Sequence, residues 1–539
     1  MPEAAAFDGL AREFFSGWLR FHPGAALTTG LSDCSGLPAP QSDDDHAALG
    51  SLLETLIVAL QELDHDALDT DRRLDAELLF GLAAVEHREL LERDWRHRDP
   101  LRFLPLTEIH RLTLLAAPSL REDLLALLTA IPAHLRLAIT QLTPMAELIP
   151  PPLVAAAARA AAAGPGYLRA LVRSRWLATH CRGIGEIEAA AEAAATALRQ
   201  YAAALKSAIA PRAAGRCGCG PAHLGFLLRH RHRLPLRPDD CTPLLERLAS
   251  ARNLGAAEMV PAAATATSEG LRAECARLRQ LLGERLRLTL PVAPLRVATG
   301  PVRPRLTPGA TAEDDAKKDD TGTVPLDRDG IDYVPDLTRG HGTLYLPDGE
   351  SVPARAPGAE AALSLQCLRL GWGGLHSLIF AGGMAARSLP RLLAGGVSLR
   401  EGWPLALAEL VLAGSDAEMT VRAAERTAVA QARLDLDLHL GRLSLAAARE
   451  RAAALGDADG VLADLIRNPG DALARVLGWQ LIAAVQNSLA QDPAASRSFH
   501  DRLLMRGPIP ASTAIALASD EATLQRTLAG LCNTGQAPP

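Results

Sequence analysis

Long stretches of this chain repeat apolar residues at intervals of three and four, and this spacing is the feature that most limits its fold. In residues 43–64 the apolar stripe consists of Leu49, Leu52, Leu53, Leu56 and Leu60. Such a stripe lies on one face of an α-helix and has to pack against a neighbouring helix. The same spacing recurs at residues 3–20, 72–94, 119–147 and 184–209. We therefore predict a mainly helical protein.

Local composition supports the helical prediction. Alanine and leucine, which favour helices, dominate residues 155–163 and 189–205. Alternating or β-favouring residues occur at 285–297 and 342–346, where we expect short strands. The predicted fold class is all-α with a minor strand element, and its short connections favour antiparallel neighbouring helices.

A proline-rich and charged stretch at residues 301–330 interrupts the helical pattern. Pro301, Pro304 and Pro308 precede residues 313–320, a charged run with little apolar surface to bury. The chain has 539 residues, of which 48% are hydrophobic, enough for more than one lobe. The predicted units are an N-terminal helical lobe at 1–300, a flexible insertion at 301–330 and a C-terminal lobe at 331–539.

Charge and cysteine content exclude several classes of partner. The chain has 56 Lys and Arg against 62 Asp and Glu, so it offers no positive field for nucleic acid or an anionic membrane. The first residues lack the pattern of a secretory signal, and no apolar run reaches the roughly 20 residues that span a bilayer. Eight cysteines are too few for a disulfide scaffold. We expect a cytoplasmic protein with reduced thiols, and we prefer ordinary thiols over a zinc site for Cys217 and Cys219.

Two segments in the last third of the chain are laid out like the active-site half of a zinc peptidase. Arg369 to His376 reads Arg-Leu-Gly-Trp-Gly-Gly-Leu-His, and a helix length later Glu401 to Glu409 reads Glu-Gly-Trp-Pro-Leu-Ala-Leu-Ala-Glu. This resembles the bacterial domain-of-unknown-function 885 family, which is similar to gluzincin peptidases and carries H-E-x-x-P-G-H-H followed by E-G-W-A-L-Y-A-E. Shorter resemblances lie at residues 23–30, 74–79, 435–441 and 499–510. The resemblance covers most of the chain and implies a two-lobed, zinc-peptidase-like scaffold around a cleft.

The residues that the resemblance would assign to zinc are replaced. The family's first His, the following Glu and the next His correspond to Arg369, Leu370 and Leu375. A guanidinium and two leucines neither ligate zinc nor activate water. The downstream acid remains, as Glu401 or Glu409, and His376 falls on the family's second, adjacent histidine. We expect no catalytic zinc and no other cofactor.

Each remaining ionisable candidate also has a structural explanation. Glu401 follows Ser398 in the S-x-x-E pattern of a capping box, which we favour over metal ligation. Asp435 and His439 are four residues apart on one predicted helix, where they could form a general base or a buried contact between helices, and we favour the contact. His500 lies in the F-H-D pattern shared with the family.

The prediction from sequence is a pseudo-peptidase, a non-enzymatic protein that binds a peptide-like ligand or a protein partner in the remaining cleft. The first alternative is a hydrolase that uses the cleft without zinc, through His376, Glu401, His439 or His500. The second alternative is a structural subunit that pairs with an active paralogue. The expected cleft residues are Trp372, Gly374, His376, Trp403, Glu409 and Asp435.

Overall fold

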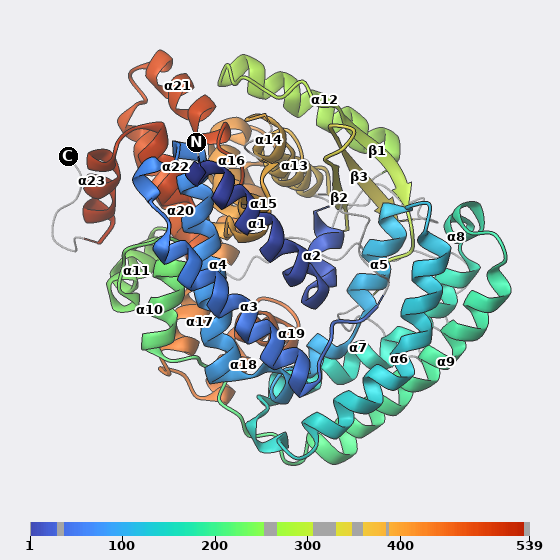
Figure 1. Cartoon of the computed structure of the whole chain (residues 1–539). Coiled ribbons are helices and arrows are strands. Elements are labelled where there is room, and N and C mark those ends of the chain that lie inside the picture. Colours follow the sequence, from blue (N-terminus) through green and yellow to red (C-terminus); the bar gives the residue numbers. More distant parts are fainter. Residues whose placement is uncertain are drawn as a thin grey trace.

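The computed structural model describes residues 2–29, 37–252, 267–304, 330–347, 359–383 and 387–532. These residues form a mainly helical protein with one small sheet, which confirms the predicted fold class (Figure 1). The five helices expected from the apolar spacing are all present, with ends that differ by a few residues. The first predicted stripe is buried through Leu49, Leu53, Leu56 and Leu60.

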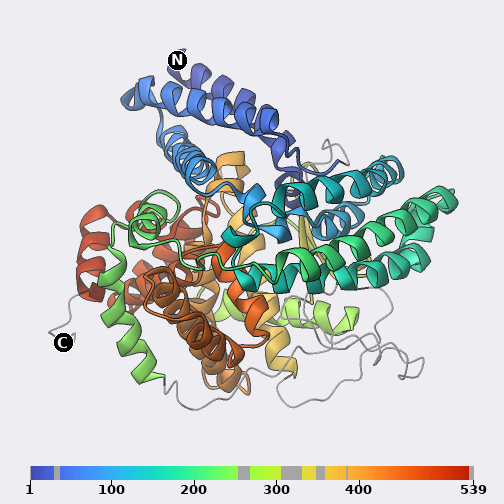
Figure 2. The same ribbon diagram turned by 90° about the horizontal axis from the view of Figure 1, so that it is seen from below.

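Helices make up the first half of the described chain. They are α1 (Pro2–Phe21), α2 (Pro23–Thr28), α3 (Asp43–Glu62), α4 (Thr70–Arg93), α5 (Leu106–Leu115), α6 (Leu120–Leu142), α7 (Pro151–Arg173), α8 (Arg175–His180), α9 (Ile184–Ala204), α10 (Pro221–His230), α11 (Thr242–Ala251) and α12 (Ser268–Arg285). α6 and α7 both pack on α9, and these three helices lie to the right of α3 and α4 in Figure 1. Seen from below, α1 and α3 form the outermost layer (Figure 2).

The second half adds eleven described helices and follows the sheet in sequence. The helices are α13 (Ala359–Leu370), α14 (Leu375–Phe380), α15 (Leu389–Ala394), α16 (Val397–Leu412), α17 (Glu418–His439), α18 (Leu445–Ala453), α19 (Ala458–Arg467), α20 (Asp471–Ser488), α21 (Pro493–Leu504), α22 (Ala511–Ala518) and α23 (Glu521–Cys532). α16 and α20 form the most extensive helix pair, and α17 packs against both.

The sheet consists of β1 (Leu295–Gly300), β2 (Asp332–Asp336) and β3 (His341–Pro347), in the order β1-β3-β2. β1 runs parallel to β3, with Leu295 opposite Gly342, and β2 runs antiparallel to β3, with Asp332 opposite Tyr345. β1 overlaps the end of the predicted segment 285–297, and β3 covers the predicted segment 342–346. β2 was not predicted, and its Pro335 is tolerated because β2 is an edge strand.

The buried hydrophobic clusters are not divided at residue 300, where the sequence predicted a boundary between two lobes. One buried cluster joins α1, α3 and α4, and a second joins α5 to α9 with side chains from α17 to α20. The third combines α10 to α12 with the sheet and the C-terminal helices. Helices from before residue 300 therefore share a core with helices from after residue 331, so the predicted lobes are interleaved.

The predicted insertion at 301–330 connects β1 to β2, two strands that both pair with β3. Residues 301–304 continue from β1, residues 305–329 lie outside the described residues, and β2 follows at Asp332. Because β1 is hydrogen-bonded to β3, the chain on either side of the insertion belongs to one sheet. The insertion is therefore a connection within a unit and does not separate two lobes.

One helix, α6, is long and apolar enough by length and composition to cross a membrane. The core helices of soluble proteins pass the same test, so this is weak evidence. In the structure α6 packs along α9 and buries a leucine- and isoleucine-rich face composed of Leu124, Leu127, Leu128, Ile131, Leu135 and Leu142.

Candidate functional site

The end of α13 and the start of α16 bring Arg369 and Glu401 together. α13 ends at Leu370, one residue after Arg369, and Glu401 lies in the second turn of α16. The two helices pack against each other, and Arg369 Nε lies 3.0 Å from Glu401 Oε2. The sequence resemblance would place a metal-binding histidine at Arg369 and a metal-binding acid at Glu401 or Glu409. Here Arg369 and Glu401 form an ion pair, with the guanidinium as the cation.

Two further arginines surround the same carboxylate. Arg400 Nε lies 3.5 Å from Glu401 Oε1, and Arg475 on α20 is close enough to affect its ionisation. Burial by itself raises the pKa of the Glu401 carboxyl, but Arg369, Arg400 and Arg475 together lower it to about 2. Glu401 is therefore ionised at neutral pH. Its side chain is 17% exposed, against 37% for Arg369 and 41% for Arg400, so the guanidinium groups form the accessible part of the cluster.

A close helix crossing sets the position of Glu401 relative to α20. A Cβ atom added to Gly402 would lie 2.5 Å from the backbone nitrogen of Trp479, and one added to Gly478 would lie 2.0 Å from the carbonyl oxygen of Ser398. Only glycine permits backbones to approach this closely. The crossing places Arg475, one turn before Gly478, beside Glu401.

The predicted capping box at Ser398 is wrong. α16 begins at Val397, its N-cap is Gly396, and no side chain caps it. The Ser398 hydroxyl instead accepts a hydrogen bond from the Ala511 backbone N–H at 2.9 Å. Pro404 lies inside α16, where it leaves the carbonyl of Arg400 without its helical donor. The Glu401 side chain therefore does not cap the helix and pairs with arginines instead.

His376 is fully buried and both ring nitrogens are occupied. Nε2 lies 3.0 Å from the Ala293 carbonyl and donates to it, and Nδ1 lies 3.0 Å from the Tyr333 hydroxyl and accepts from it. Burial lowers the pKa of His376 to about 4, so the imidazole is neutral. It anchors β2 and the segment before β1 to α14. The neighbouring Leu370 and Leu375 are half-buried and offer no ligand atoms.

Asp435 and His439 form the buried contact that we favoured. The Asp435 carboxylate accepts the backbone N–H groups of Gly470 and Leu473, both at 3.1 Å, and so satisfies the start of α20. His439 Nδ1 accepts the Cys219 N–H at 3.1 Å, and Nε2 lies 3.2 Å from Asp435. Both side chains have no exposed surface, so the pair joins α17, α20 and the loop before α10 and offers no base to a ligand.

His500 is buried and Glu409 is partly buried, each in a different environment from Glu401. Burial lowers the pKa of His500 to about 4, and its ring packs on Trp403 with centroids 5.3 Å apart. Glu409 accepts from Trp479 Nε1 at 3.2 Å and pairs with Arg252 at 2.9 Å.

Next to Glu409 lies Glu425, which the sequence did not single out. Burial and the adjacent Glu409 carboxylate raise the pKa of Glu425 to about 7, so it keeps a proton at weakly acidic pH. Among the described residues, no hydrogen bond or ion pair joins His500, Glu409 or Glu425 to Glu401.

The prediction of six residues lining an open cleft is corrected by their burial. Five of them lie in the interior with less than a tenth of their surface exposed, namely Trp372, Gly374, His376, Trp403 and Asp435. Glu409 is the exception, with 28% of its side chain exposed. The aromatic and small residues in the motif serve packing, because α13 packs on α14 and α16, and α16 packs on α20.

Arg400 and Arg475 are site residues that sequence reasoning missed. Arg400 precedes Glu401 directly, and its position was the available signal. Arg475 has no local signal, because only the crossing of α16 and α20 brings it to Glu401. Guanidinium groups such as these pair with carboxylates and phosphates through directed hydrogen bonds.

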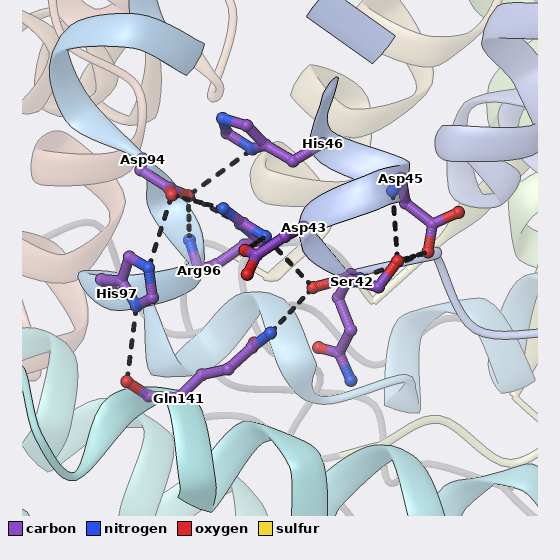
Figure 3. A network of polar contacts seen from close by, with 9 residues as sticks. Ser42, Asp43, Asp45, His46, Asp94, Arg96, His97 and Gln141 are labelled. Carbon is purple, nitrogen blue, oxygen red and sulfur yellow. Dashed lines mark hydrogen bonds and ion pairs between the residues drawn. The ribbon is translucent and has the colours of Figure 1, made fainter. Parts of the chain in front are cut away.

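A second polar network lies among α3, α4 and α6 (Figure 3). Arg96 is 6% exposed and donates to Asp94 and Asp43, each at 2.8 Å. His46 and His97 approach the same Asp94 carboxylate at 3.8 and 3.5 Å (Figure 3). Burial raises the pKa of Asp94, but Arg96 more than offsets this and lowers it. The network ties the helices together, since its Arg96 is committed to two carboxylates.

The fold is shared with solved structures of bacterial proteins, although no family model matches the chain and no curated protein matches it. A protein from Shewanella oneidensis aligns at 13% identity over 95% of this chain and 99% of its own, with a TM-score of 0.65. One from Colwellia psychrerythraea aligns at 14% identity over 99% of this chain and 100% of its own, with a TM-score of 0.68. Both carry the provisional description of lipoproteins, and the first is further described as of unknown function. These likenesses extend over nearly the whole chain and show the fold alone.

Proposed function

We propose that this protein is a non-catalytic relative of zinc peptidases that binds a peptide-like ligand or a protein partner. The observation that carries the proposal is the 3.0 Å ion pair between Arg369 and Glu401. The resemblance of residues 369–376 and 401–409 to a zinc-binding motif assigns these two positions to metal ligands. A guanidinium that already neutralises the surviving acid removes the reason for a metal to bind there.

The charge of the cluster indicates the chemistry of the ligand. Arg369, Arg400 and Arg475 supply three positive charges around one carboxylate, Glu401. Half-exposed guanidinium groups pair with carboxylates through two parallel hydrogen bonds. We infer that the ligand presents a carboxylate, as the C-terminus of a peptide does.

Binding of peptide mixtures to the full-length protein tests this proposal. We expect a fluorescent mixture of short peptides with free C-termini to bind at least about tenfold more tightly than the same mixture with amidated C-termini, because one charge-assisted pair is worth about 1.5–3 kcal/mol. Arg400→Ala should weaken binding of the free-carboxylate mixture. Arg497→Ala, on the exposed surface of α21, is the matched control.

Equal affinity for the two mixtures, or an Arg400→Ala protein that binds as well as the unaltered one, would contradict the carboxylate-binding role.

The zinc content of the purified protein is a separate test. We expect less than about one zinc per ten chains after purification with zinc supplied, because a catalytic site needs about three protein ligands. A chelator should leave the thermal midpoint unchanged, since an unbound metal adds no linkage free energy. Stoichiometric zinc that is lost in a Glu401→Gln protein would overturn the pseudo-peptidase proposal.

Two alternatives to the pseudo-peptidase, a zinc-independent hydrolase and a structural subunit, can be distinguished from it by experiment. A zinc-independent hydrolase would need an accessible base, whereas His376, His439 and His500 are buried. A structural subunit would form a stable complex with an intact paralogue in co-purification. Peptide hydrolysis by the purified protein favours the first, and obligate co-purification with a paralogue favours the second.

The location of the protein in the cell is a separate part of the proposal. The N-terminal residues predict a cytoplasmic protein, whereas the two fold neighbours are described provisionally as lipoproteins. We infer from those descriptions that export and membrane attachment is the competing location. Fractionation of cells that express the full-length gene product distinguishes the two, through its presence in the soluble cytoplasmic or the membrane fraction.

A further inference from the structure

Arg475 differs from the other two arginines around Glu401 in its contacts. Arg369 and Arg400 both pair with Glu401, at 3.0 and 3.5 Å. Arg475 forms no ion pair with any residue that the structure describes. Its Nη1 donates a hydrogen bond to the side-chain oxygen of Gln431 at 3.1 Å, and its buried Nε has no partner among the described protein groups. No contacting carboxylate therefore neutralises its charge.

Three helices fix the position of Arg475 in the cluster. α20 carries Arg475 and packs on α16, which carries Glu401, and on α17, which carries Gln431. A Cβ atom added to Gly402, the residue after Glu401, would lie 2.9 Å from the Arg475 carbonyl oxygen. The Arg475 backbone thus lies against the turn of α16 that carries Glu401. The hydrogen bond to Gln431 then limits the directions in which the guanidinium can point.

Gln431 orients this guanidinium without cancelling its charge. A glutamine side chain is neutral, whereas a carboxylate at the same place would form an ion pair with the arginine. Glu401 and Asp464 interact with Arg475 electrostatically, but neither forms an ion pair with it. The Asp464 carboxylate instead accepts a hydrogen bond from Asn468 Nδ2 at 2.9 Å. Arg475 is half-buried, so water screens its charge less than on an open surface.

We propose that Arg475, held in position by Gln431, is the residue that binds the carboxylate of the ligand. This inference rests on the proposed function, which gives the ligand a carboxylate, and it identifies the residue that recognises that group. A guanidinium binds a carboxylate through two parallel N–H···O hydrogen bonds. Arg369 and Arg400 have a different role, since they neutralise Glu401 and so reduce its repulsion of the incoming anion. The ligand class is a peptide with a free terminal carboxylate.

Binding of the two fluorescent peptide mixtures to full-length variants tests this assignment. In Gln431→Glu, a carboxylate of nearly the same shape would pair with Arg475 and occupy it. We expect the preference of at least about tenfold for free over amidated C-termini to fall below about twofold in Gln431→Glu and in Arg475→Ala. Affinity for the amidated mixture should not change, whereas a general structural defect would weaken both mixtures. Arg475→Lys keeps the charge without the paired N–H groups and should show an intermediate preference.

Gln200→Glu is the matched control, because it makes the same change on the exposed surface of α9 and should keep the wild-type preference. Circular dichroism establishes that each variant keeps its helical content. A wild-type preference that survives in both Gln431→Glu and Arg475→Ala would overturn the assignment and leave carboxylate binding to the other two arginines. A preference that is lost in Arg475→Ala but kept in Gln431→Glu would overturn the role of Gln431. Equal affinity of the wild type for both mixtures would overturn the assignment and the proposed function together.

Discussion

At the scale of single residues, the arginines around Glu401 keep its carboxyl group ionised. Replacement by glutamine leaves Arg369, Arg400 and Arg475 close together without a carboxylate. We expect Glu401→Gln to lower the unfolding free energy at pH 7 by about 1–3 kcal/mol. The pKa of Glu401 is lowered to about 2 in the folded protein, so its stabilisation is complete above the unfolded value near 4.5 and is lost as the pH falls towards 2.

Urea unfolding of both proteins between pH 7 and pH 3 measures this effect. The difference between wild type and Glu401→Gln should stay constant down to pH 5 and then shrink. Glu192→Gln is the control, because Glu192 is 61% exposed and pairs with Arg199 on the surface, where such pairs are worth little. A difference that grows as the pH falls would show that Glu401 is not stabilised as an anion.

At the scale of elements, the crossing of α16 and α20 depends on two glycines. Gly478→Ala would place a Cβ atom 2.0 Å from the Ser398 carbonyl oxygen and push the helices apart. We expect it to lower the unfolding free energy by about 2 kcal/mol or more, as overpacking of a core does. Gly283→Ala on α12 is the matched control, since nothing lies within 4 Å of the new Cβ, and it should stabilise by about 0.5–1 kcal/mol through helix propensity.

Denaturant unfolding monitored by circular dichroism compares the two glycine variants. If Gly478→Ala were as stable as wild type, the close approach of α16 and α20 would be wrong. The position of Arg475 beside Glu401 would then have to be revised too.

The elements also show where sequence reasoning succeeds and where it stops. The helix at 43–62 was predictable because its apolar stripe and the start at Ser42 are local features, and Ser42 and Asp45 form a capping box there. The same pattern at Ser398 led to a wrong prediction, because the Ser398 hydroxyl accepts a hydrogen bond from the backbone N–H of Ala511, which lies on a distant helix. The Arg369 and Glu401 positions followed from the motif, whereas Arg475 depends on a helix crossing that leaves no local pattern.

At the scale of the whole molecule, buried neutral imidazoles make stability depend on pH. Burial lowers the pKa of four of them to about 4, namely His134, His232, His376 and His500. In the unfolded chain these groups titrate near 6.5, so the unfolded state binds more protons between pH 6.5 and 4. Stability contributed by the neutral rings is present above pH 6.5 and is lost as the pH falls towards 4.

We expect the unfolding free energy to fall by at least about 2 kcal/mol between pH 6.5 and 4.5. Two groups oppose this trend. The pKa of Glu425 is raised to about 7, so its contribution is lost as the pH rises from 4.5 to 7. Burial lowers the pKa of His439 but Asp435 and Cys219 raise it to about 10, so its contribution is fully present below pH 6.5; these are two groups against four. His500→Gln should reduce the part of this fall in unfolding free energy that the four buried imidazoles contribute by about one quarter. A stability that is flat across this range in denaturant titrations would contradict the burial of these rings.

The interleaved cores predict how the chain responds to a nick. Cleavage within residues 301–330 should give two fragments that elute together in gel filtration and separate only in denaturant. β1 and β3 stay hydrogen-bonded across the cut, and the third buried cluster contains helices from both fragments. Fragments that separate under native conditions would instead support the two separate lobes predicted from the sequence.

The pairing of Arg369 with Glu401 also limits how this chain can change by descent. Loss of Glu401 alone would leave the Arg369 guanidinium without its carboxylate, whereas loss of Arg369 alone would leave Glu401 paired with Arg400. Related chains that lack the glutamate should therefore lack the arginine as well. A histidine at position 369 would still leave the Arg400 guanidinium 3.5 Å from Glu401, and Leu370 and Leu375 would offer no ligand atoms. No single substitution at this site therefore supplies the three protein ligands that a catalytic zinc needs.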